Sequence, residues 1–328
     1  MSPIIDAGKL SRIVPITGVI LFIYIILDIG LDRITYTFSM IPPLYYIAAL
    51  LVFTPKLLLA TYKWWYISSK QRINLPCIYL AKLFLMSLFY ASLTPGALGL
   101  HVRIYYMKKR SGESIEKCIA NSFIDSTSGI IGGIILATVG SLIYINLTPG
   151  LLPILVIILL FYGSAFIFFM EKKRGSRFLH ILIYPFLPDK YHKNLDQIID
   201  LLYKDLPSLN QLILPFILEL IIWTIAASQV YVLAQAFNIT IPYLEFIVIS
   251  VVSVVLATTI PITVGGLGVR EGTFVILLSQ YGVPSEIAFV LSLSGFLVKN
   301  FIPGVIGLIL FLIKPEEGKP ILLPGEEF

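Results

Sequence analysis

Long apolar runs alternate with short polar segments along most of this chain. A transmembrane helix needs about 20 mostly apolar residues, because the hydrocarbon core of a bilayer is about 30 Å thick. Six runs satisfy this requirement and predict full transmembrane helices at about 13–30, 41–62, 116–146, 150–170, 210–236 and 285–313. The pattern therefore predicts an all-α polytopic membrane protein.

Two further apolar stretches, about 76–107 and 243–281, are each interrupted by a glycine-rich break, TPGALG at 94–99 and GGLG at 265–268. Each stretch either crosses the membrane once or returns to its starting side as a re-entrant hairpin. Lys and Arg concentrate in cytoplasmic loops, and only the hairpin arrangement places the basic loops on one side. We therefore predict two re-entrant hairpins and cytoplasmic N- and C-termini. Eight simple spans stay an alternative, because 83–100 is uncharged and long enough to cross.

The two breaks also indicate an internal repeat, since each precedes an Arg, a short apolar helix and a Gly before the next span. With hairpins, repeat 1 (about 1–146) and repeat 2 (about 147–314) have opposite orientations and form one transmembrane domain, 1–314. Inverted repeats place a binding site near the middle of the membrane, at interrupted helices. The alternative is that Gly and Pro only kink ordinary spans.

Two segments are expected outside the bilayer. Within the cytoplasmic loop 171–209, apolar residues recur at helical spacing between acidic ones, which favours an interfacial amphipathic helix. A small soluble helix packed on the loops is the alternative. Residues 315–328 carry Pro, Gly and Glu without periodicity, and they predict a short cytoplasmic tail.

Composition excludes a soluble domain, because 57% of the residues are hydrophobic, 13% are charged and the mean hydropathy is +0.91. The net charge of +5 lies in loops between spans, so we expect no nucleic-acid partner. Cys77 and Cys118 lie in apolar stretches and are interpreted as structural thiols. Three His without a Cys/His cluster, and no phosphate-binding Gly-Lys-Ser loop, predict no metal, no cofactor and no enzymatic activity.

Arg103 and Arg270 follow the breaks closely, each near the start of a short helix. A helix N-terminus beside a guanidinium binds anions, because free N–H groups and the helix dipole add to the charge of the Arg. The predicted substrate-binding residues are these two Arg with Lys299, Gly96, Gly99, Gly265, Gly266, Gly268 and Glu271. The alternatives are snorkelling for Arg103 and a structural pair with Glu271 or another acid for Arg270.

Lys299 lies near the centre of an apolar run, too deep to snorkel comfortably. It is expected to face a cavity or an acid. Asp125 and Glu219 are the available acids, and either is expected to pair with Lys299 or an Arg, or to carry a proton coupled to transport. Lys56 and Lys82 are expected to snorkel.

Two motifs resemble a known family. Residues 261–272, PITVGGLGVREG, are similar to the P-x-x-x-G-G-L-G-V-R-E-G signature of the flippase-like family named for the transmembrane region of lysylphosphatidylglycerol synthase. TPGALG followed by Arg103 resembles that family's first motif, P-G-x-L-G-x-x-x-R, and Lys63-Trp64 stands where the family usually has Arg-Trp. From its position after Lys63, Trp64, like Trp65, is also expected to anchor at the membrane interface.

The resemblance implies a lipid flippase or transporter of the cytoplasmic membrane that moves a lipid with an anionic phosphate headgroup, such as a phospholipid or a polyprenyl-phosphate-linked lipid. Two departures stand out. Asp125 is followed by Ser126 where the family commonly has Arg, and the soluble aminoacyl-transferase domain of the synthases is expected to be absent. A non-catalytic subunit that scaffolds a lipid- or glycan-modifying enzyme is the main alternative, and an intramembrane transferase is a third.

Overall fold

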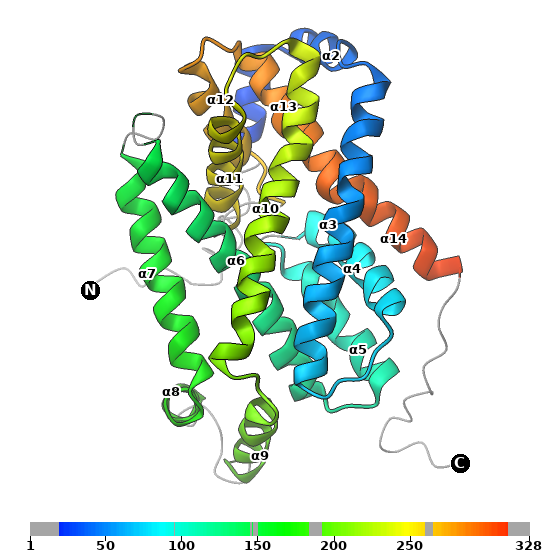
Figure 1. The fold of residues 1–328 in the computed structure, drawn as a ribbon, viewed down its shortest axis with the longest axis vertical. Helices are drawn as coiled ribbons and strands as arrows, with labels where there is room; N and C mark the ends of the chain where they lie inside the picture. Colours follow the sequence, from blue (N-terminus) through cyan, green and yellow to red (C-terminus); the bar gives the residue numbers. More distant parts are fainter. Residues whose placement is uncertain are drawn as a thin grey trace, which may run out of the picture.

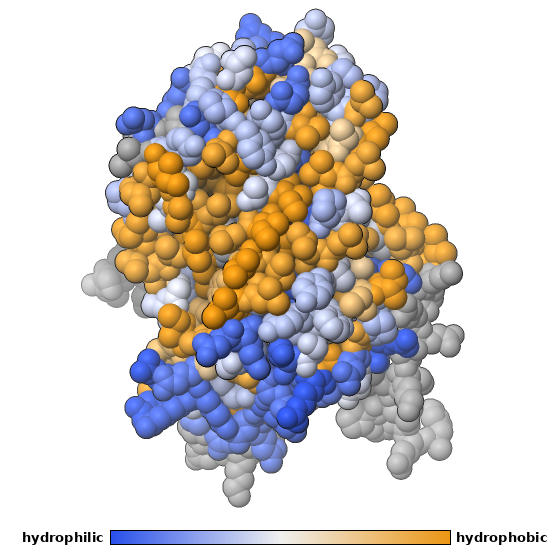
Figure 2. Space-filling model, viewed as in Figure 1, coloured by the Kyte–Doolittle hydropathy of each residue, from blue (hydrophilic) through white to orange (hydrophobic). Residues whose placement is uncertain are grey.

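The computed structural model describes residues 20–94, 96–144, 146, 150–183, 192–259 and 265–313. Within these ranges the chain forms α-helices joined by turns and short 3-10 or π segments, with no β-strand. Five helical segments are long and apolar enough to cross a membrane. Figure 2 shows an apolar band around the middle of the molecule and hydrophilic surface at both ends. The predicted all-α polytopic membrane fold is confirmed.

Five of the six predicted spans coincide with these segments. They are α3 (Pro43–Lys70), α6 (Ile115–Ile143), α7 (Leu151–Met170), the segment Leu209–Phe237 containing α10 (Ile213–Ala234), and Ser285–Ile313. The last of these comprises α13 (Ser285–Phe296), the π-helical turn η6 (Leu297–Phe301) and α14 (Ile302–Ile313). The sixth is described only from Ile20, as Ile20–Ile29 followed by α2 (Leu31–Ser39), and 13–19 lie outside the described residues.

The first broken stretch folds back on itself. Its arms are α4 (Cys77–Ser92) and, after the break, η1 (Leu98–Val102) with α5 (Arg103–Ser111), and α4 packs against both. Sixteen residues of α4 rise about 24 Å, less than the thickness of the hydrocarbon core. Gly112, at a φ of 73°, ends α5, and the Ser114 hydroxyl caps α6.

The second broken stretch forms the equivalent hairpin from α11 (Tyr243–Thr259) and α12 (Val269–Ser279), which pack together. Beyond α12, the Tyr281 hydroxyl donates a hydrogen bond to Glu245 of α11. Burial, together with this hydrogen bond, raises the pKa of Tyr281. Figure 1 places α5 in the lower half of the molecule and α12 in the upper half, so the two hairpins enter from opposite ends.

The tips of the two hairpins meet. The backbone N–H of Gly265 donates to the carbonyl of Thr94 across 3.5 Å, which joins the two glycine-rich breaks. Gly265 has a φ of 60°, and a Cβ there would lie 2.8 Å from the Ser92 carbonyl oxygen. This close approach explains why a glycine is needed at the contact.

The two halves pack in a reciprocal manner. At the centre α3 packs against α10, while α14 packs against α4 of the first hairpin and α6 packs against α11 of the second. Small residues allow these helices to approach closely, as is common in membranes. A Cβ added at Gly304 of α14 would lie 2.8 Å from Cα of Phe89, and one at Gly132 of α6 would lie 2.7 Å from Cβ of Glu219. A helix of each half therefore packs against the hairpin of the other half, an arrangement that fits inverted repeats.

The loop between the halves contains α8 (Lys172–Ile183) and α9 (His192–Tyr203), which confirms helical structure in the region 171–209. Leu195 and Ile199 of α9 are buried, and α9 packs against α6. Figure 1 places α8 and α9 at the same end as α5. We call it the basic end because α5 carries Lys108, Lys109 and Arg110 in its last turn and α8 carries Lys172, Lys173, Arg174 and Arg177. The predicted tail, 315–328, lies outside the described residues.

This arrangement predicts that the outer turns of the two hairpins are reached from opposite sides of a membrane. In a variant with Cys77 and Cys118 replaced by Ser, a single cysteine at Lys109 or at Ser279 is labelled in sealed, oriented vesicles with an impermeant maleimide. Lys109→Cys should react from the cytoplasmic side, and Ser279→Cys should react from the other side. Reaction of both cysteines from the same side would contradict the inverted orientation.

Candidate functional site

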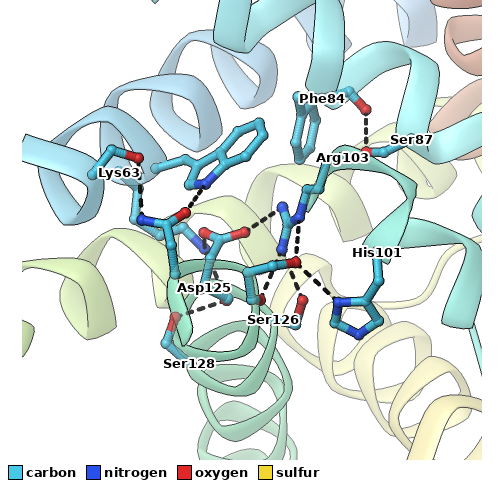
Figure 3. A network of polar contacts seen from close by, with 12 residues as sticks. Lys63, Phe84, Ser87, His101, Arg103, Asp125, Ser126 and Ser128 are labelled. Atoms are coloured by element: carbon cyan, nitrogen blue, oxygen red, sulfur yellow. Dashed lines mark hydrogen bonds and ion pairs between the residues drawn. The ribbon is translucent and has the colours of Figure 1, made fainter. Parts of the chain in front are cut away.

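Four charged side chains from four helices form one buried network. Figure 3 shows three of them, Lys63, Arg103 and Asp125. Lys63 of α3, Arg103 of α5, Asp125 of α6 and Glu219 of α10 are each at most 5% exposed. Close packing of α6 and α10 brings these side chains together. Gly129 and, one turn later, Gly132 of α6 face the Glu219 side chain, and a residue larger than glycine would not fit at Gly132. Two cations and two carboxylates give the network no net charge.

Lys63 connects both acids. Its ammonium lies 2.7 Å from Oδ1 of Asp125, also forms an ion pair with Oε1 of Glu219, and donates to the Asp125 carbonyl at 3.4 Å. Two of its three N–H donors therefore form hydrogen bonds, to Glu219 and to the Asp125 carbonyl, and the contact with Oδ1 of Asp125 is an ion pair. The ion pair between Lys63 and Glu219 joins α3 to α10, which belong to different halves of the chain. The ion pair between Lys63 and Asp125 joins α6 to the same cluster.

The Arg103 guanidinium has an acid, two hydroxyl groups and an aromatic ring as partners. Its Nη1 lies 2.6 Å from Oδ2 of Asp125, Nε donates to the Ser122 hydroxyl at 2.9 Å, and Nη2 donates to the Ser126 hydroxyl at 2.8 Å. The guanidinium also lies over the Trp64 ring, 4.6 Å from its centroid. Ser126, where the resembled family commonly has Arg, thus accepts a hydrogen bond from Arg103. The network fixes the start of α5, and with it the first hairpin, to α6.

Arg270 occupies the corresponding place in the second hairpin, where it has partners in the hairpin itself and also donates to the Ser292 hydroxyl of α13 at 3.3 Å. It forms an ion pair with neighbouring Glu271, donates to the Gly265 carbonyl at 3.1 Å and lies 4.5 Å from the centroid of the Phe296 ring. Glu271 in turn accepts the N–H of Gly268 at 2.7 Å, which caps α12. The second break is therefore shaped by one acid and one Arg.

A cavity of about 230 Å³ lies beside the hairpin tips. The first break contributes Ala97 and Leu100, the second hairpin contributes Arg270, and small or apolar side chains of α10 and α11 complete much of the wall. Its lining residues are Lys56, Leu88, Ala91, Ala97, Leu100, Ile222, Trp223, Ala226, Ala227, Ser250, Val251, Val254, Thr258, Arg270, Lys299 and Asn300. Three of them are cations and none is an acid.

Within the described part of the chain, two of these cations have no carboxylate partner. Lys56 donates to the backbone carbonyl of Lys299 at 3.1 Å and lies over the Phe53 ring. Among the residues that the structure describes, neither Lys56 nor Lys299 forms an ion pair with a carboxylate, although they are only 7% and 9% exposed. Lys299 lies in the π-helical turn η6, a geometry often found at functional sites. Two buried cations without acids favour a bound anion.

The structure brings together only part of the predicted site. Arg270 and Lys299 line the cavity, whereas Arg103 does not and is bound to Asp125 instead. Gly96, Gly265, Gly266 and Gly268 adopt positive φ in the breaks, and Gly99 lies against the Tyr90 carbonyl and bonds to the Thr94 hydroxyl. These glycines shape the loops. Whether they contact a substrate stays a prediction.

Asp125 pairs with Arg103, which agrees with the expected pairing of an acid with an Arg. Three other expectations from the sequence are corrected. Glu219 pairs with Lys63 and, among the described residues, with neither Lys299 nor an Arg. Lys56 does not snorkel, because it is buried at the cavity. Trp64 is no interfacial anchor: it is fully buried beneath Arg103, and its indole N–H donates to Asn121 at 2.8 Å.

Sequence reasoning missed Lys56 and Lys63 as site residues. A signal was present for both, because they stand seven residues apart on α3 and therefore share one face of the helix. Two cations on one face of a transmembrane helix favour an interior location over the lipid.

These features define a multi-pass helical membrane protein with two opposed re-entrant hairpins and a buried cationic cavity at their tips. The chain belongs to the family of the lysylphosphatidylglycerol synthase transmembrane region, whose model matches residues 11–307.

Two archaeal relatives are similar over most of the chain. UPF0104 membrane protein MJ1078 of Methanocaldococcus jannaschii is 28% identical over 236 residues, which cover 69% of this chain and 94% of the relative. A UPF0104 membrane protein of Methanothermobacter thermautotrophicus is 24% identical over 297 residues, which cover 85% of this chain and 88% of the relative.

Proposed function

We propose that this protein transports a lipid with an anionic phosphate headgroup across the cytoplasmic membrane, with its basic end in the cytoplasm, and that it acts as a carrier and not as an enzyme. The observation that carries the proposal is the cavity lined by Lys56, Arg270 and Lys299. A phosphate headgroup supplies the negative charge that Lys56 and Lys299 do not receive from any described carboxylate, and Arg and Lys are the side chains best suited to bind it.

The position of the cavity supports transport. It lies at the meeting point of two hairpins that enter from opposite ends, and inverted repeats with broken helices are typical of alternating-access transporters. The cavity wall is mostly apolar with few polar groups. Such a wall suits a lipid whose headgroup enters the cavity while its acyl chains stay in the surrounding bilayer. The basic end faces the cytoplasm by the positive-inside rule.

The test is lipid translocation in liposomes. Purified protein is reconstituted with phosphatidylglycerol that carries a fluorophore on its acyl chain, and the probe in the outer leaflet is bleached with dithionite. The wild type should translocate the probe. The double variant Lys56→Met, Lys299→Met should do so about tenfold more slowly or worse, since each lost charged contact is worth about 1.5–3 kcal/mol.

The matched control is Lys173→Met, which removes a cation from the exposed surface of α8. Lys173→Met should keep the wild-type rate. As a second control, the wild type should translocate fluorescent phosphatidylcholine more slowly than fluorescent phosphatidylglycerol. Equal rates for the wild type and the cavity variant would contradict the proposal.

A further inference from the structure

Glu219 stands apart from Asp125 within the buried network. Asp125 binds two cations, with Oδ1 facing Lys63 and Oδ2 facing Arg103. Glu219 binds only Lys63, through Oε1, and among the described residues Oε2 has no hydrogen-bond partner. Protonation of Asp125 would break two ion pairs and leave Arg103 without a carboxylate. Protonation of Glu219 breaks one, and Lys63 keeps Asp125.

Glu219 lies on a helix that lines the cavity, although Glu219 itself is not a lining residue. Ile222 and Trp223, three and four residues further along α10, line the cavity wall, so their backbone positions are about one helical turn, roughly 5–6 Å along the axis, from that of Glu219. On α3, Lys56 lines the cavity and Lys63 follows two turns later. The helices α3 and α10 therefore both contribute residues to the cavity wall, and they are also joined by the ion pair between Lys63 and Glu219.

The charged groups around Glu219 are few. The helix α3 contributes Lys56 and Lys63, α6 contributes Asp125, and η6 contributes Lys299. The remaining elements packed against α10 are α11, α13, η4 (Leu209–Leu212) and η5 (Gln235–Phe237). Their only charged residues are Glu245 and Glu286, in the first turns of α11 and α13 at the end opposite the basic end.

We propose that Glu219 is a proton-binding site coupled to the cavity, so that an anion entering the cavity promotes the uptake of a proton from water onto the Glu219 carboxylate. In the empty cavity the cations favour the ionised carboxylate. A bound anion opposes their field and strengthens proton binding at Glu219, by an expected factor of about ten, which is within the usual range for two coupled sites. Thermodynamic reciprocity then requires that protonation of Glu219 strengthens anion binding by the same factor.

This inference rests on the proposed anion site, and its test measures binding and proton uptake together. Dihexanoyl-phosphatidylglycerol is the probe, because its single phosphodiester charge does not titrate near neutral pH. It is added to the purified full-length protein in weakly buffered detergent with a pH-indicator dye, while calorimetry reports binding. At the pH of greatest uptake the wild type should take up about half a proton per bound probe, the amount that a tenfold change in proton binding produces, and its affinity should rise as pH falls.

Glu219→Gln should bind the probe without proton uptake, with an affinity independent of pH, and Glu219→Asp should restore uptake. Glu171→Gln, which changes an exposed carboxylate of a surface pair with Arg174, should behave as the wild type. Thermal unfolding of each variant shows whether it is folded. Should Glu219→Gln fail to fold, Glu219→Asp still decides through the pH dependence of uptake. The pH range of uptake should shift in Glu219→Asp if residue 219 carries the proton, and an unchanged range overturns the inference.

The outcomes separate the two proposals. Saturable binding without proton uptake by the wild type overturns the coupling and leaves the anion site in place. Uptake that persists in Glu219→Gln assigns the proton to another group and also overturns the inference. No saturable binding by the wild type overturns both the anion site and the coupling.

Discussion

Replacing Asp125 by Asn is expected to lower the free energy of unfolding by about 3–5 kcal/mol, the usual cost of removing one partner from a buried ion pair. The change removes the negative charge that faces Lys63 and Arg103, and it leaves two buried cations with Glu219 alone. The change weakens the attachment of the first hairpin to α6, which then depends on the hydrogen bonds from Arg103 to Ser122 and Ser126. The measurement is the midpoint of thermal unfolding in detergent, followed by size-exclusion chromatography of the heated protein.

Asp200→Asn is the matched control. Asp200 pairs with Lys172 at 2.9 Å, but both side chains are more than half exposed. Surface pairs contribute about 0–1 kcal/mol, so this variant should unfold close to the wild-type temperature. Equal stability of Asp125→Asn and Asp200→Asn would show that the buried network does not hold the hairpin.

Replacing Lys299 by Met is expected to have the opposite effect on stability. Lys299 is buried without a carboxylate partner among the described residues, so its charge destabilises the empty protein. Met fills a similar volume without that cost, and the empty variant should unfold at the wild-type temperature or a few degrees higher. Stabilisation by added phosphatidylglycerol, which reflects binding to the folded state, should weaken.

The stability of the empty Lys299→Met protein and its weaker stabilisation by phosphatidylglycerol are expected to occur together. A less stable Lys299→Met protein with an unchanged response to lipid would mean that Lys299 has a structural partner and that the anion binds elsewhere. Lys173→Met, on the exposed surface of α8, serves again as the control and should change neither quantity.

The arrangement of helices was predictable because it depends on local properties of the chain. Apolar length marks α3, α6 and α7, and the distribution of Lys and Arg distinguishes hairpins from spans at the two breaks. These signals do not depend on which helix packs against which. The same is true of Gly265, whose break is visible in the sequence as a run of glycines.

The partners of the buried charges were not predictable in this way. Whether Lys56 reaches the headgroups or a cavity depends on the neighbours of α3, and α10 is more than 140 residues away in the chain. Glu219 meets Lys63 because glycines on α6 let α10 approach, a tertiary contact that the charge pattern does not encode. Trp64 follows a Lys as an interfacial anchor would, yet Arg103 covers it.

The contact between the hairpin tips has a mechanical consequence. A backbone hydrogen bond from Gly265 to Thr94 joins the two loops there, and such a bond contributes a net stabilisation of only about 1 kcal/mol. The seam between α3 and α10, by contrast, is extensively packed along its length. Breaking this contact between the loops therefore costs far less than separating α3 from α10, or than separating each hairpin from the helix of the other half that packs against it.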